Sequence, residues 1–175
     1  MNDIANRKEK AALFFRYAMH YGLQLGIIVF LVMITGIRYI LSGSFAGIFM
    51  VLLIVVPFKL HRYMKKYRED VLTNQITYAQ AWSFGNITFF FASLISAMGI
   101  YLFFEYFSPG SLTAINKHFH DMLMKVSQQD IPLVDTPAIE YAVNSIMSLC
   151  AGGMILSAIV AGFVKKKPNP QTLNT

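Results

Sequence analysis

The feature that most constrains this chain is a set of four long stretches without a single Asp, Glu, Lys or Arg. They cover residues 17–37, 39–58, 71–104 and 141–164, and Leu, Ile, Val, Phe, Met and Ala dominate them. A helix crosses a hydrocarbon core of ~30 Å with about 20 mostly apolar residues, whereas a barrel strand needs only ~9–11. The sequence therefore predicts an all-α integral membrane protein with four transmembrane helices, at about 17–37, 45–60, 81–104 and 141–164.

The composition agrees with this class of protein. Hydrophobic residues make up 55% of the 175 residues and charged residues 14%, against ~45–50% and ~25% in soluble domains. So much apolar surface excludes a disordered chain and exceeds what one soluble core of this size buries. The single cysteine excludes an intrachain disulfide framework. We expect one membrane domain over residues 1–167 and a disordered cytoplasmic tail over 168–175.

The basic residues predict the topology. Twelve of the 15 Lys and Arg residues form three clusters, and basic loops stay on the cytoplasmic side. Two clusters on one side require an even number of crossings between them, which favours a short, separate second helix over one long helix. Both termini are then cytoplasmic, and this placement explains the charge without nucleic acid. The clusters are Arg7, Lys8, Lys10 and Arg16; Lys59, Arg62, Lys65, Lys66 and Arg68; and Lys165, Lys166 and Lys167.

The segment between the third and fourth helices predicts a further, amphipathic helix. Ser111 is a plausible N-cap, and apolar residues then recur at spacings of three and four, which indicates one apolar face. We expect this helix to lie on the outer membrane surface or to cap the bundle. The apolar residues are Leu112, Ile115, Phe119, Met122, Leu123 and Val126, with Asn116, Lys117, His120, Asp121 and Lys125 mostly on the other side.

Neither a catalytic motif nor a metal motif stands out. His118 and His120 are two residues apart, so on a helix their side chains point ~200° away from each other and cannot share an ion. No phosphate-binding glycine loop or nucleophile elbow is present in the sequence. We therefore expect no metal, no cofactor and no catalytic residue.

Polar residues within the spans are the stronger functional candidates, because burial in the membrane makes them costly. Gln24, Asn86 and Asn144 stand out, either as interhelical hydrogen-bonding groups or as parts of a solute path. Gln24 and Asn86 lie at equal predicted depth, and we expect a hydrogen bond between them. Arg38 and Glu105 mark the outer ends of the first and third helices and could form an ion pair there.

The fourth span is rich in small residues spaced four apart. Such spacing allows helix backbones to approach closely, either within one chain or between two copies. The pairs are Ser148 and Gly152, Gly153 and Ser157, and Ala158 and Gly162.

Three segments carry a resemblance to a known family. Residues 76–85 read ITYAQAWSFG, residues 89–97 read FFFASLISA, and the basic stretch at 165–170 reads KKKPNP. With these, the chain resembles the uncharacterised bacterial membrane family called domain of unknown function 4199 over nearly its whole length. The resemblance implies a four-span protein of the bacterial inner membrane with a periplasmic third loop. It implies no activity and no catalytic residues.

Three classes of function remain open at this point. A non-enzymatic membrane component or subunit, with the lipid bilayer and either a second copy or another membrane protein as partners, agrees best with the lack of catalytic motifs. A small-solute transporter or channel is the alternative, supported by Gln24, Asn86 and Asn144. A membrane-bound enzyme would depend on His118, His120 and Asp121.

Overall fold

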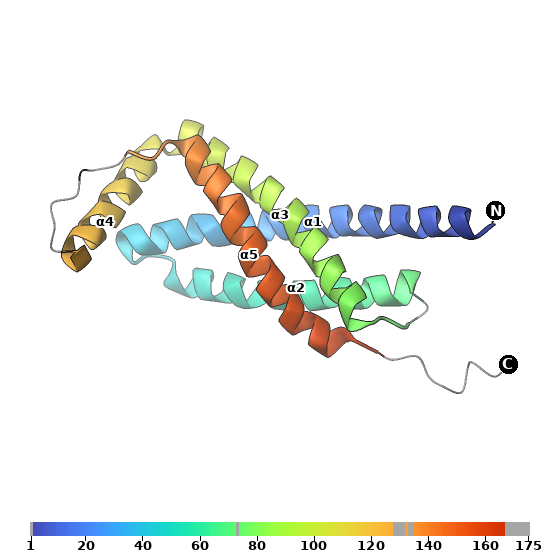
Figure 1. Cartoon of the computed structure of the whole chain (residues 1–175). Helices are drawn as coiled ribbons and strands as arrows, with labels where there is room; N and C mark the ends of the chain where they lie inside the picture. The colour runs from blue at the N-terminus through green and yellow to red at the C-terminus, as the bar shows by residue number, and fades with distance from the viewer. Residues whose placement is uncertain (1, 73, 128–131, 133–134, 167–175) are drawn as a thin grey trace.

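The computed structural model describes residues 2–72, 74–127, 132 and 135–166, and the predicted tail at 168–175 lies outside these residues. The described part of the chain is almost entirely helical (Figure 1). The all-α prediction is therefore confirmed. The elements are α1 (Asn2–Ser42), α2 (Ala46–Val71), α3 (Tyr78–Leu102), the π-helical turn η1 (Phe103–Phe107), α4 (Pro109–Ser127) and α5 (Ala138–Val164).

Four helical segments are long and apolar enough to cross a membrane: Lys8–Ser42, Ala46–Val71, Tyr78–Phe107 and Ala138–Val164. The predicted number of four such helices is confirmed, and the second is a separate helix of 26 residues rather than a short one. The helices extend beyond the charge-free stretches, because Lys, Arg and Glu are good helix formers and do not end a helix. The basic stretch after Leu60, for example, continues α2 to Val71.

The helices form a bundle with two distinct ends (Figure 1). α1 and α2 run antiparallel, and α3 and α5 cross them at an angle, with α3 packing extensively against both α1 and α5. The N-terminal part of α1, the α2–α3 connection and the end of α5 lie at one end. We call it the basic end because the described residues of the three basic clusters lie in or next to these segments. The α1–α2 turn and α4 lie at the other, the α4 end.

The α1–α2 turn is tight because glycine permits it. Gly43 has φ 66°, a left-handed conformation that residues with a Cβ adopt only at a cost. Its N–H donates to the carbonyl of Tyr39 over 2.8 Å and satisfies a group left open at the end of α1. The chain thus reverses within a few residues, and α2 begins at Ala46.

The core lies along α3, and the outside of the bundle is apolar. Ala81, Phe84, Ala92 and Ile100 of α3 are at most 1% exposed. Large apolar side chains are exposed on every spanning helix, among them Phe58 and Phe163. Such a surface suits a hydrocarbon environment, whereas a soluble monomer rarely exposes extended apolar patches.

α4 is the helix predicted for the external segment, with two differences. It begins at Pro109 rather than after an N-cap at Ser111, and Ser111 lies buried in its first turn. Proline is favoured there because the first helical residues need no N–H donor. Only the first half of the apolar face packs on the bundle: Ile115 is 3% exposed, whereas Val126 is 82% exposed. Asn116, which we placed on the polar side, is buried.

Candidate functional site

The predicted intramembrane residue Gln24 lies in a polar network at the basic end of the bundle. Its Oε1 accepts a hydrogen bond from the Tyr63 hydroxyl of α2 over 3.1 Å. Its Nε2 lies 3.0 Å from Nε2 of His20, one turn earlier on α1. The side-chain amide is thus satisfied by α2 and by its own helix.

The predicted hydrogen bond between Gln24 and Asn86 is wrong. Gly22 and Gly26 are the residues of α1 that face α3, since a Cβ on either would lie within 3 Å of α3 atoms. Gln24 is two residues from each, so its side chain points away from α3. Oδ1 of Asn86 is buried and has no hydrogen-bond partner among the described residues.

Asn144 lies at the α4 end, at the opposite end of the bundle from Gln24. It contributes to a pocket of about 390 Å³ between α4, the α4–α5 connection and the first turns of α5. Asn116 closes one side of this pocket, donating to Oδ1 of Asp135 over 2.8 Å and to the carbonyl oxygen of Thr136 over 3.2 Å. The pocket residues are Asn116, Phe119, His120, Leu123, Pro132, Thr136, Glu140, Tyr141 and Asn144.

The predicted ion pair between Arg38 and Glu105 is also not formed. Both residues are exposed, and the ion pairs found among the described residues involve neither. Glu105 lies within η1. A π turn holds more residues than an α turn and so redirects the side chains within and after it. Helical spacing alone could not anticipate this change of direction.

The small residues of the fourth span divide between two faces. Gly153 and Ser157 are buried against α3, where a Cβ on Gly153 would lie 2.4 Å from Phe89. Gly152 and Gly162 face open space instead. The Gly153–Ser157 pair therefore packs within the monomer, which decides between the two alternatives for this pair.

Further close contacts of α3 involve glycines that we did not single out. A Cβ on Gly85 of α3 would lie 2.5 Å from the Ser157 hydroxyl of α5, and one on Gly99 would lie 2.7 Å from the ring of Phe30 of α1. Gly22 and Gly26 already indicate this pattern in the sequence, because they are spaced four apart like the pairs in the fourth span.

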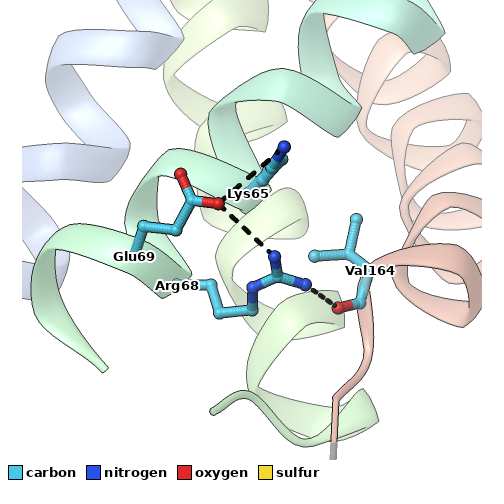
Figure 2. A network of polar contacts seen from close by, with 4 residues as sticks. All are labelled: Lys65, Arg68, Glu69 and Val164. Carbon is cyan, nitrogen blue, oxygen red and sulfur yellow. Dashed lines mark hydrogen bonds and ion pairs between the residues drawn. The ribbon is translucent and has the colours of Figure 1, made fainter. Parts of the chain in front are cut away.

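The basic end is closed by a polar network around Arg68 that sequence reasoning missed. Figure 2 shows Nη1 of Arg68 donating to the last carbonyl of α5, that of Val164, over 3.0 Å. Glu69 lies 3.5 Å from Nη2 of Arg68 and 3.9 Å from Nζ of Lys65. The Arg68 side chain is only 15% exposed. A C-terminal carbonyl without an intrahelical partner is thus satisfied by a cation, which the helix dipole also favours.

A second contact completes this closure. The backbones of Ile76 and Lys166 exchange two hydrogen bonds, of 3.3 and 3.0 Å. Arg68 lies in the last turn of α2 and Ile76 in the α2–α3 connection, so both of these segments hold the end of α5.

The arrangement of potential ligands offers little metal chemistry. Among the described residues, no three His, Cys, Asp or Glu side chains converge. His120 and Asp121 form a contact of 3.6 Å on α4. Cys150 lies in α5 with Sγ 3.5 Å from the Ser93 hydroxyl.

Comparison with known proteins places the chain in a family. No curated protein and no solved structure matches it. The family model described as "Protein of unknown function (DUF4199)" matches residues 20–166, a range that includes all of α2 to α5 and most of α1. The chain therefore belongs to the DUF4199 family, as the segments at 76–85 and 89–97 indicated.

Proposed function

We propose that this protein is a non-enzymatic, multi-pass component of the bacterial inner membrane that acts as a scaffold or subunit for another membrane protein. The observation that carries the proposal is the close packing of α3 against its neighbours. On the α1 side the contacts involve Gly22, Gly26 and Gly99, and on the α5 side Gly85 and Gly153. At each of these glycines a Cβ would lie less than 3 Å from a neighbouring atom.

Such packing favours a static bundle. Helices in close contact along their length do not shift gradually past one another, because the interior between them is packed as densely as an organic crystal. A carrier needs elements that move against each other around a central site. In this bundle the central element is instead fixed on two sides, which suits a structural role.

The orientation we propose has both termini in the cytoplasm. Its support is the position of the three basic clusters, which share one end of the bundle. Lys and Arg in short connections remain on the cytoplasmic side. The α4 end then faces the periplasm.

One observation favours small-solute transport as a second candidate. The pocket at the α4 end combines Asn116, Glu140 and Asn144 with apolar residues in about 390 Å³. Few, well-placed polar groups in an apolar pocket are typical of small-molecule sites.

Affinity purification from native membranes after mild cross-linking tests the main proposal. The tagged chain should co-purify with a stoichiometric membrane-protein partner or a second copy, whereas a tagged, unrelated four-span protein of the same membrane should not. Purification of the chain without a stoichiometric partner, together with solute flux into proteoliposomes that Asn144→Leu abolishes, would contradict the scaffold and support transport.

A further inference from the structure

The basic end holds an open pocket that neither the family nor the proposed function assigns. Its volume is about 750 Å³. Arg16 is the last charged residue before the first apolar stretch, so the pocket lies where charged sequence meets hydrocarbon-compatible sequence. Phospholipid headgroups occupy this level of a membrane. The pocket residues are Leu13, Arg16, Tyr17, Met19, His20, Tyr21 and Leu23 of α1 and Asp70 of α2.

Two opposite charges face this pocket without neutralising each other. Arg16 and Asp70 both line it and both are exposed. The ion pairs among the described residues, which extend to 4.0 Å, include neither residue. Arg16 therefore has donors for an anion, and Asp70 has acceptors for a cation, within one cavity.

His20 adds a directed donor. With the Gln24 amide oriented so that its oxygen accepts from Tyr63, Nε2 of Gln24 donates to Nε2 of His20. A nitrogen that accepts carries no proton, so in this arrangement the N–H of the ring lies on Nδ1. Nδ1 is then the remaining donor of a side chain that lines the pocket.

The rest of the pocket is apolar and aromatic. Leu13, Met19 and Leu23 contribute aliphatic surface, and Met19 and Leu23 are about half exposed. Tyr21 is fixed in the wall by stacking on Tyr63, with ring centroids 4.5 Å apart. Tyrosine is common where one part of a site is apolar and the other wet.

We propose that this pocket binds a zwitterionic phospholipid with a primary ammonium group, of the phosphatidylethanolamine class. Arg16 and Nδ1 of His20 hold the phosphate, and Asp70 holds the ammonium. Met19 and Leu23, which lie on the apolar side of Arg16, contact the acyl chains. A phosphatidylglycerol has no ammonium group to pair with Asp70. The quaternary ammonium of a phosphatidylcholine has no N–H group to donate a hydrogen bond to the carboxylate. The site is independent of the scaffold proposal.

Native mass spectrometry of the detergent-purified protein tests the site. The protein is titrated with phosphatidylethanolamine, phosphatidylglycerol and phosphatidylcholine of identical chains, and we expect the first to bind about tenfold more tightly, as one charge-assisted contact predicts. Arg16→Gln should weaken that binding about tenfold on the same reasoning, and Arg16→Lys should restore part of it. Lys8→Gln, which removes a charge from the same helix outside the pocket, should leave binding unchanged.

Asp70→Asn tests the ammonium contact separately. It should abolish the preference for phosphatidylethanolamine over phosphatidylglycerol, whereas Glu9→Gln should retain the preference. Soluble phosphoethanolamine should not displace the lipid at equal concentration, and displacement would identify a soluble phosphorylated amine as the ligand instead. Equal binding of all three lipids by the parent protein, or unchanged binding by folded Arg16→Gln and Arg16→Lys, would overturn the proposal.

Discussion

At the scale of single residues, polar groups within the spans find partners that depth alone does not predict. The depth of Gln24 could be read from the sequence, but its partner depends on which face of α1 carries it. Gly22 and Gly26 take the face toward α3, so Gln24 bonds with Tyr63 of α2 instead. The sequence thus predicted the polar residue correctly and its partner incorrectly, because helical rotation is set by packing.

The Gln24–Tyr63 contact makes a testable prediction. In a double-mutant cycle, Gln24→Leu and Tyr63→Phe should show a coupling of about 0.6 kcal/mol and at most about 1.7 kcal/mol, the range measured for hydrogen bonds between membrane helices. The free energy of unfolding in mixed micelles is the quantity to compare. The matched cycle of Gln24→Leu with Asn86→Leu should be additive, because these residues share no contact. Coupling in the second cycle and additivity in the first would contradict the observed network.

At the scale of helices, the sequence predicted well which helices form and in what order. It predicted less well which face of each helix packs against a neighbouring helix. The charge-free stretches predicted the four spans, since a long apolar run in a membrane has few alternatives to a helix. The helices themselves are longer than the predicted spans because charged residues at 8–16 and 59–70 continue them. The small residues of the fourth span were recognised, but the sequence did not show that Gly153 faces α3 whereas Gly152 and Gly162 face open space.

The two adjacent glycines of α5 provide a matched test of this packing. Gly153→Ala should destabilise the protein by about 1–3 kcal/mol, because the added methyl overlaps Phe89 of α3. Gly152→Ala should be neutral or stabilising by up to about 1 kcal/mol, since its Cβ meets open space and alanine favours the helix. Thermal unfolding of the two variants in detergent measures the difference. Equal stability would mean that α5 is rotated relative to the structure.

At the scale of the whole molecule, the distribution of charge and the arrangement of helices lead to the same topology. Three basic clusters that are far apart in sequence come together at one end of the bundle. The sequence predicted this arrangement, because two basic clusters on the same side of the membrane need an even number of crossings between them. The closure around Arg68 could not be predicted, because it joins a side chain of α2 to a backbone carbonyl 96 residues later. Contacts of this kind depend on how α2 and α5 pack.

The topology predicts which ends of the bundle a membrane-impermeant reagent reaches. In a Cys150→Ser background, Gly110→Cys places a thiol at the α4 end where a Cβ meets open space, and Gln75→Cys places one at the exposed α2–α3 connection. An impermeant maleimide should label Cys at 110 in intact cells, because the α4 end is expected outside. It should label Cys at 75 only after the membrane is disrupted, because basic connections stay in the cytoplasm. Both thiols should react in detergent, which controls for accessibility. Labelling of position 75 in place of position 110 in intact cells would reverse the orientation. Labelling of both positions would place them on the same side of the membrane, which requires an even number of crossings between them and contradicts α3 as a single span.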